Sequence, residues 1–193
     1  MFNIKYNKLN KLRILNGWNN IQSLHLSEIY DFKYGEGNNI PENTGTYPIY
    51  GGGGICGYYD KFNSEDSPVI GHIGAYAGLV QWAKGKHFVT YNGVICTHKN
   101  KLINKRYAFY LLLKQDFIAK QKGSQPFISY DILNKPEVNF PPLEIQEEIV
   151  NILDKFEEYI NSIESGLKGE IEARHQQYEY YRDKLLTFDR KEV

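Results

Sequence analysis

The chain has 193 residues, of which 41% are hydrophobic and 15% aromatic, a composition that suits one or two packed domains and excludes intrinsic disorder. It contains no run of about 18 apolar residues, and its start, MFNIKYNKLNKLR, lacks the apolar stretch of a secretory signal, so we expect a cytosolic protein. Cys56 and Cys96 form no CxxC pair, and a reducing cytosol argues against a disulfide between them.

The net charge is zero, but it is divided unevenly along the chain. Residues 1–143 contain 16 Lys and Arg against 10 Asp and Glu, which gives +6, and residues 144–193 contain 7 against 13, which gives −6. A basic part favours a polyanionic partner, although +6 is a modest charge. Because the pattern of the sequence also changes here, at NFPPLE, we predict two domains, 1–143 and 144–193.

The sequence of the first domain predicts short strands separated by glycine and proline turns. Only one stretch, NKRYAFYLLLKQDFIAKQK (104–122), has the three-to-four spacing of a helix, with Tyr107, Tyr110, Leu111, Lys114 and Ile118. This domain is therefore predicted to be α+β. The strand-like segments are YPIYG (47–51), SPVIGHIG (67–74), GLVQWA (78–83), HFVTYNGVICTH (87–98) and KPEVNFPP (135–142).

Four consecutive glycines, Gly51 to Gly54, lie between two pairs of tyrosines in YPIYGGGGICGYYD. A phosphate-binding loop would need a lysine and a hydroxyl residue at the end of the run, and the lysine is missing. A dinucleotide fingerprint would need a following helix, but a turn-rich and then strand-like stretch follows. The run is therefore interpreted as a backbone turn at which side chains would clash or φ must be positive.

The second domain is predicted to be one long helix that starts after Pro141 and Pro142. Glutamates in the first turns suit the positive end of the helix dipole. From 144 to 187 the helix would span roughly 66 Å, with a kink or break favoured near Gly166 and Gly169. Its apolar stripe is too long for a domain of this size to cover, so part of it should meet another helix; the alternative is a helix wrapped on its own domain. The stripe contains Ile149, Ile152, Phe156, Ile160, Ile163, Leu167, Ile171, Arg174, Tyr178, Tyr181 and Leu185.

Catalytic patterns are mostly absent from the sequence. NFPPL resembles the Asn/Asp-Pro-Pro-aromatic loop of amino-methyltransferases only superficially, because no acidic or amide residue is adjacent to the prolines. The five histidines have neither HExxH nor Cys/His metal spacing, and no GxSxG elbow occurs. We therefore expect no metal, no cofactor and no catalysis by this chain.

The order of several segments resembles the specificity (S) subunit of type I restriction-modification systems over nearly the whole chain. The segments are NGWNNIQSLHLSEIYDFKYGEG, TYPIYGGGGICGYYDKF, PVIGHIGAYAGLVQ, GSQPFIS and the distinctive PPLEIQEEIVNILDKF with EIEARHQQYEYYRDKLL. The resemblance implies a DNA-reading subunit for a bipartite site, whose partner subunits methylate adenine or translocate and cut DNA. It makes 1–143 a target recognition domain, shaped in part by the glycine run, and 144–193 a spacer helix.

Family members usually have two recognition domains and two spacer helices, so this chain resembles a half subunit that would act as an antiparallel homodimer. Two other hypotheses are an interaction module or regulator that binds the methyltransferase without reading DNA, and an enzyme with a site hidden in the tyrosine-rich domain. For each candidate residue the simpler interpretation is a solvated surface side chain. The candidates for DNA contact are Lys33, His72, Tyr76, Lys84, Lys86, Ser124 and Gln125, and those for dimerisation are Ile149, Ile152, Phe156, Ile163, Leu167 and Tyr178.

Overall fold

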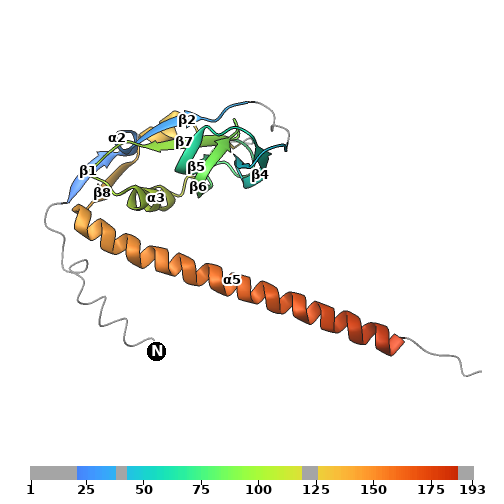
Figure 1. The fold of residues 1–193 in the computed structure, drawn as a ribbon. Helices are drawn as coiled ribbons and strands as arrows, with labels where there is room; N and C mark the ends of the chain where they lie inside the picture. The colour runs from blue at the N-terminus through green and yellow to red at the C-terminus, as the bar shows by residue number, and fades with distance from the viewer. Residues whose placement is uncertain (1–20, 38–42, 119–125, 187–193) are drawn as a thin grey trace, which may run out of the picture. The chain divides into compact units, whose positions relative to one another are not determined.

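The computed structural model describes residues 21–37, 43–118 and 126–186 (Figure 1). The chain divides into two compact units, residues 1–148 and residues 149–193. The first unit contains all the described strands together with three short helices, and the last helix begins in it and continues as the second unit. The mixed α and β fold with a long C-terminal helix is as predicted.

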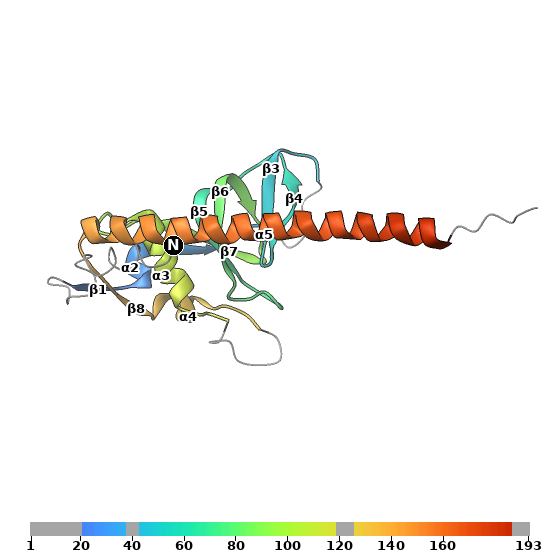
Figure 2. The same ribbon diagram turned by 90° about the horizontal axis from the view of Figure 1, so that it is seen from below.

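A six-stranded sheet forms the centre of the first unit (Figure 2). All its neighbouring strands are antiparallel except β3 and β6, which run parallel. Each predicted strand segment overlaps an observed strand, but residues 87–98 cover the end of β6, a turn and β7, and residues 72–74 lie after β5. Strands β1 (Gln22–His25), β2 and β4 were not among the predicted segments. In spatial order the strands are β2 (Tyr30–Tyr34), β7 (Gly93–His98), β5 (Ser64–Gly71), β6 (Val80–Val89), β3 (Tyr47–Gly51) and β4 (Gly54–Tyr59).

Central strands of this sheet carry the apolar core. Strand β5 pairs with β6 on one side and β7 on the other, and its Val69 and Ile70 side chains are fully buried. Val69 packs in one cluster with Tyr50, Ala83, Val89 and Ile95, and together these five residues come from four neighbouring strands. Burying an aliphatic side chain of this size contributes about 1.5–3 kcal/mol, so this cluster is a main source of the unit's stability.

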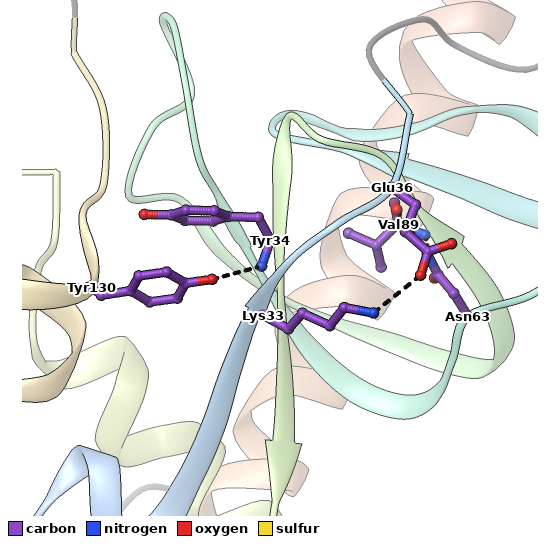
Figure 3. Close-up of polar contacts among 6 residues, drawn as sticks. All are labelled: Lys33, Tyr34, Glu36, Asn63, Val89 and Tyr130. Carbon is purple, nitrogen blue, oxygen red and sulfur yellow. Dashed lines mark hydrogen bonds and ion pairs between the residues drawn. The ribbon is translucent and has the colours of Figure 1, made fainter.

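An asparagine side chain holds the end of β6. The Asn63 amide nitrogen donates to the Val89 carbonyl at 2.9 Å, and the Val89 N–H donates to the Asn63 Oδ1 at 2.8 Å. The same carbonyl accepts the Glu36 N–H at 3.0 Å, and Figure 3 shows these residues together. One backbone position thus joins the segments that follow β2 and β4 to the end of β6.

A second, two-stranded sheet brings the ends of the first unit together. Strand β1 (Gln22–His25) pairs antiparallel with β8 (Glu137–Phe140), so Gln22 lies opposite Phe140. Two helices that the sequence analysis missed, α2 (Leu26–Ile29) and α4 (Tyr130–Asn134), contact each other beside this sheet. Each has only four or five residues, which is too short to show a helical period in the sequence.

Helix α3 (Lys105–Lys114) is shorter than the predicted helix 104–122. Its N-cap is Asn104, whose side-chain oxygen accepts the N–H groups of Arg106 at 2.9 Å and Tyr107 at 3.1 Å. The helix ends at Lys114, and Asp116 adopts a positive φ of 46°, which is incompatible with a continuing right-handed helix. The apolar spacing up to Ile118 therefore predicted a helix that is longer than the observed one.

Helix α5 runs from Leu143 to Leu186 as one unbroken element, close to the predicted 144–187 (Figure 1). The break that Gly166 and Gly169 favoured does not occur, because both glycines are helical. Although α5 is long, no helix among the described residues is apolar enough over its length to cross a membrane.

The first turn of α5 is anchored to the first unit by Gln146, a fully buried polar side chain. Its Oε1 accepts the Asn104 N–H at 2.7 Å, and its Nε2 donates to the carbonyls of Pro141 at 2.8 Å and Leu102 at 3.1 Å. One amide therefore satisfies three backbone groups, including the N-cap residue of α3. Buried backbone groups left without partners are costly, so this side chain couples the starts of the two helices.

Replacing Gln146 with Leu should destabilise the first unit by roughly 2–5 kcal/mol, because three buried backbone groups lose their partner while the volume changes little. Urea unfolding followed by tryptophan fluorescence measures this loss. Gln177→Leu, at an exposed position of α5, is the matched control and should change the stability by less than about 0.5 kcal/mol. Equal effects of the two substitutions would show that Gln146 is not an anchor.

Candidate nucleic-acid interface

The glycine run forms the tip of the β3–β4 hairpin, where it lies against two other segments. A Cβ at Gly53 would lie 2.7 Å from Cδ2 of the Tyr76 ring, and one at Gly52 would lie 3.1 Å from the Asn92 carbonyl oxygen. Gly54 adopts a φ of +120°, which favours glycine. The run therefore allows three segments to approach closely: the hairpin tip, the β5–β6 loop and the β6–β7 turn.

The β5–β6 loop, residues 72–79, is held by its own backbone. The N–H of Gly71 donates to the Leu79 carbonyl and the N–H of Gly78 donates back to the Gly71 carbonyl, both at 2.8 Å. Gly74 and Gly78 have φ values of 85° and 88°, in the left-handed region. Tyr76, at the tip of this loop, is 58% exposed. The loop thus presents an exposed aromatic ring on a backbone that its hydrogen bonds define.

His72 ties this loop to the β6–β7 turn. Its backbone N–H donates to the Asn92 carbonyl at 2.8 Å, and its Nδ1 lies 2.9 Å from the Tyr91 carbonyl oxygen. Because a carbonyl only accepts, Nδ1 carries the proton in this contact. His72 is only 4% exposed, so it does not lie on the surface as the sequence analysis expected.

Four ring side chains, Tyr34, His72, Tyr91 and Tyr130, form an aromatic cluster below the loop. Tyr34 stacks between His72, at a centroid distance of 3.9 Å, and Tyr130, at 4.3 Å. Tyr91 meets the Tyr34 and His72 rings edge to face. The Tyr34 N–H donates to the Tyr130 hydroxyl at 3.3 Å, as Figure 3 shows. Burial raises the pKa of the Tyr34 hydroxyl, and the nearby Tyr130 raises it further, so this hydroxyl remains uncharged at neutral pH.

The segment after residues 119–125 returns to the same loop. The Gly74 N–H donates to the Pro126 carbonyl at 3.0 Å and the Ile128 N–H to the His72 carbonyl at 2.8 Å. Phe127 is 52% exposed. It lines an open cavity of about 380 Å³ together with Tyr34, His72, Ile73 and Tyr91. Ser124 and Gln125 lie outside the described residues, but the chain that follows them is fixed beside Tyr76's loop.

The three lysines among the candidates lie on other elements. Lys33, on β2, is exposed and forms an ion pair of 3.1 Å with Glu36 (Figure 3). Lys84 and Lys86 are exposed on β6 on either side of Gly85, and the Lys86 ammonium lies 4.6 Å from the Phe62 ring centroid. The structure therefore brings His72 and Tyr76 together in one loop but does not show the lysines in contact with that loop.

A basic segment was missed by the sequence analysis. HKNKLINKR, residues 98–106, contains Lys99, Lys101, Lys105 and Arg106 and no acidic residue, a charge pattern visible in the sequence itself. Lys99 pairs with Asp31 at 2.6 Å, and the Arg106 guanidinium lies 5.1 Å from the Trp82 ring centroid. This segment adds positive charge to the surface at the start of α3.

Clusters with metal-binding geometry are not found in the described part of the chain. No three His, Cys, Asp or Glu side chains there come together as metal ligands. Cys56 and Cys96 are both free, and burial raises the pKa of the Cys96 thiol far above its ordinary value, so this thiol is unreactive.

The dimerisation candidates on α5 differ in exposure. Ile149 and Ile152 are half-buried, whereas Phe156, Ile163 and Leu167 are exposed, Ile163 by 67%. The backbone of Tyr178 is helical, and its side chain lies outside what the structure describes. Tyr159, Ile160 and Ile171 are also exposed, so large apolar side chains continue along the helix.

Comparison with known proteins gives consistent matches. The model of the type I restriction modification DNA specificity domain matches residues 19–173. A Mycoplasma pneumoniae protein named as a type I specificity subunit is 31% identical over 175 residues, which cover 86% of this chain and 47% of the relative. The type I restriction enzyme MpnII specificity subunit of the same species is 30% identical over 77% of this chain and 47% of its own length.

The fold is also similar to a solved structure. The crystal structure of a type I restriction-modification S subunit from M. genitalium matches with a TM-score of 0.68 at 24% identity, covering 93% of this chain and 49% of that one. The chain thus spans about half the length of the relatives it matches.

Gly53→Ala should destabilise the first unit by roughly 1–3 kcal/mol, because its methyl group would overlap the Tyr76 ring. In a Tyr76→Ala background the same substitution should cost less than about 0.5 kcal/mol, since the overlapping ring atoms are gone. Urea unfolding of the unmodified protein, the two single variants and the double variant measures the coupling between position 53 and the Tyr76 ring.

Gly57→Ala is the control for this cycle, because its Cβ would meet the flexible end of Ile49 at 3.4 Å and the Asn43 side chain at 3.7 Å, which are both ordinary contact distances. Additive effects of Gly53→Ala and Tyr76→Ala would contradict the close packing of the hairpin tip on the loop.

Proposed function

This chain belongs to the family of type I restriction-modification DNA specificity domains, and from that premise we propose that it reads the DNA sequence at which partner subunits act. The observation that carries the proposal is the convergence of the hairpin tip, the β5–β6 loop and the β6–β7 turn at the glycine run. Loops held at one place by a rigid sheet are suited to recognition, because their side chains vary while their positions do not.

Within this surface we assign different roles to different residues. Tyr76 is exposed at the tip of its loop, and Ser124 and Gln125 precede the segment that pairs with that loop, so these three are assigned to base edges. Lys33, Lys84 and Lys86 are exposed and are assigned to phosphates. His72 is buried and bonded to the neighbouring turn, so it positions the loop rather than touching DNA.

The charge of the chain supports a DNA-binding surface. Residues 1–143 carry a net charge of +6, and the basic segment 98–106 adds an exposed cationic stretch that the first set of candidates did not include. Phosphate contacts of this kind supply affinity that is independent of sequence and falls with salt. We therefore assign residues 1–143 to target recognition and expect binding to depend strongly on ionic strength.

Catalysis is assigned to partner subunits. In this proposal a methyltransferase subunit methylates adenine with S-adenosylmethionine, a restriction subunit translocates and cuts DNA, and this chain directs both to a bipartite site in the cytoplasm. The chain itself needs no cofactor for that role. A protein that binds the methyltransferase without reading DNA remains the competing function, and DNA binding separates the two.

A homodimer would supply the second reader of a bipartite site. The chain matches about half of the length of its relatives. Its spacer helix exposes Phe156, Ile163 and Leu167 to solvent. Burying such side chains contributes about 1.5–3 kcal/mol each, which favours association. Two copies related by a two-fold axis place identical readers in opposite orientations, so the expected site is an interrupted palindrome.

Lys84→Ala should weaken binding to all duplexes alike and lower the slope of log K against log salt by about 1, because a phosphate contact is lost. Gln125→Ala should instead change the preferred sequence, since an amide can recognise adenine through two hydrogen bonds. Selection from randomised duplexes, followed by fluorescence anisotropy with the methyltransferase subunit present, measures both effects.

Lys168→Ala, an exposed lysine of α5, is the control and should change neither affinity nor preference. Identical effects of the Lys84 and Gln125 substitutions on selected and random duplexes would overturn the assignment of roles. If the unmodified protein binds no duplex at all, the DNA-reading function is wrong and the interaction module is favoured.

Replacing both Ile152 and Phe156 with Glu should give monomers that bind half-sites only, because two charges enter the apolar stripe. Sedimentation velocity measures the mass, and anisotropy with full and half-sites measures the binding. Ser162→Glu with Ser165→Glu adds the same charge away from the stripe and should leave the dimer intact. A double stripe variant that keeps its mass and its full-site affinity would rule out the homodimer.

A further inference from the structure

The roles assigned above leave the cavity beside the β5–β6 loop without a ligand. Its volume is about 380 Å³, and its lining consists of Tyr34, His72, Ile73, Tyr91 and Phe127. Four of these five side chains are rings, and none of the five is an acidic side chain, a lysine or an arginine. Protein sites for small molecules range from about 300 to 1,000 Å³, so this volume suits one small ring system.

Contacts between separate segments of the chain hold the walls of this cavity. The Tyr34 ring, on β2, stacks with the His72 ring at 3.9 Å and with the Tyr130 ring of α4 at 4.3 Å (Figure 3). The His72 Nδ1 donates to the Tyr91 carbonyl at 2.9 Å, and the Ile128 N–H donates to the His72 carbonyl at 2.8 Å. Because the walls are fixed in this way, a ligand would need to order few side chains.

Two rings of the lining remain accessible for stacking. Tyr91 is 39% exposed and Phe127 is 52% exposed. Tyr34, in contrast, already lies between two other rings, and His72 is only 4% exposed. Aromatic rings favour offset stacking and edge-to-face contact with another flat ring. A flat ligand would therefore stack on Tyr91 or Phe127.

The chemistry of the lining favours a nucleobase over a phosphate. Phosphates in protein–DNA complexes are held by cationic and hydrogen-bonding groups, and no lysine or arginine lines this cavity. Every nucleobase, in contrast, has flat faces that stack on aromatic side chains whatever the sequence. The cavity thus suits a base that has left its place in the duplex.

The position of the cavity also favours DNA as the source of this base. Ile73 lies in the same loop as Tyr76, and the Gly74 N–H donates to the Pro126 carbonyl at 3.0 Å, directly before Phe127. Residues 1–143 have a net charge of +6, which attracts a polyanion. Proline-rich peptides also bind grooves lined by aromatic side chains, but they do not need this charge.

The reaction assigned to the partner subunit provides an unpaired base. A methyltransferase cannot reach its target atom inside a duplex, so it extrudes the target base and leaves the opposite base without a pair. Stacking on aromatic side chains compensates in part for the stacking that a base loses when it leaves the duplex. An aromatic cavity on the reading subunit would therefore favour the opened form of the site.

We propose that this cavity receives one unstacked base of the bound DNA, with Tyr91 and Phe127 as the rings on which it stacks. The proposal rests on the DNA-reading function inferred above and adds a binding site for a base outside the duplex. Tyr34, His72 and Tyr130 support the walls. Through this cavity the chain recognises how easily a base leaves the stack, in addition to the base edges.

An abasic scan of a duplex obtained by selection tests this site. Each base of one half-site is removed in turn, and fluorescence anisotropy with the methyltransferase subunit present gives the affinities of the full-length protein and of Phe127→Leu. The ratio of the two affinities isolates the cavity, because contacts that a base makes elsewhere are common to both proteins. Urea unfolding checks that the substitution of this half-exposed side chain leaves the stability unchanged within about 0.5 kcal/mol.

Removing the base that enters the cavity should bring this ratio to about one. Removing the base opposite it should raise the ratio at least about fivefold above that of the intact duplex, because no pair has to be broken before stacking. Removal at other positions should change the ratio less than twofold. Tyr91→Leu should give the same pattern as Phe127→Leu, and Phe127→Tyr, which keeps a ring, should behave like the unmodified protein.

Phe62→Leu is the matched control, because this ring is 44% exposed and lies outside the lining. Its ratio should be the same for every duplex of the scan. A uniform ratio for Phe127→Leu would overturn the proposal while DNA reading stands, whereas failure of the unmodified protein to bind any duplex would contradict DNA reading itself. Adenosine and a proline-rich peptide test the other occupants: binding of either one that Phe127→Leu abolishes, together with a uniform ratio, would assign the cavity to a different ligand.

Discussion

The close backbone approach at Gly52 and Gly53 is the constraint on which the proposed reading surface depends. Without side chains there, the hairpin tip can lie against the Tyr76 ring and the Asn92 carbonyl, and the β5–β6 loop is held next to the β6–β7 turn. His72 and the aromatic cluster fix the loop from below, while Tyr76 and Phe127 remain exposed. A glycine run that could be taken for a phosphate site is thus a packing device, and the groups it positions are aromatic and polar.

The two units differ in the surfaces they offer. The first is basic and contains the apolar core of the sheet, and the buried Gln146 amide anchors the start of α5 to it. The second is acidic and leaves large apolar side chains exposed along a single helix. The basic surface of the first unit suits a polyanion, and the exposed apolar side chains of the second unit suit another helix. In our proposal one chain therefore combines a DNA-reading domain with one of the two helices of a spacer.

Sequence patterns predicted the elements with strong local signals and missed those defined by distant contacts. The long helix was predicted within one residue at each end, because its stripe is periodic and Pro141 and Pro142 mark its start. Helices α2 and α4 are too short to show a period, and the end of α3 depends on the positive φ of Asp116. His72 has the composition of a surface turn, but its stacking on Tyr34, 38 residues earlier, buries it. The basic segment 98–106 could have been predicted from the sequence, because its four Lys and Arg residues occur without an acidic one.

Mapping methylated adenines in cells that carry this chain with its methyltransferase partner tests the central claim most directly. If two copies of one reader direct the modification, the methylated adenines should share one motif with two identical half-sites in inverted orientation and a fixed spacer between them. Loss of this chain should abolish methylation at that motif. An unchanged methylation pattern in its absence, or a motif with two different half-sites, would contradict a sequence-reading homodimer.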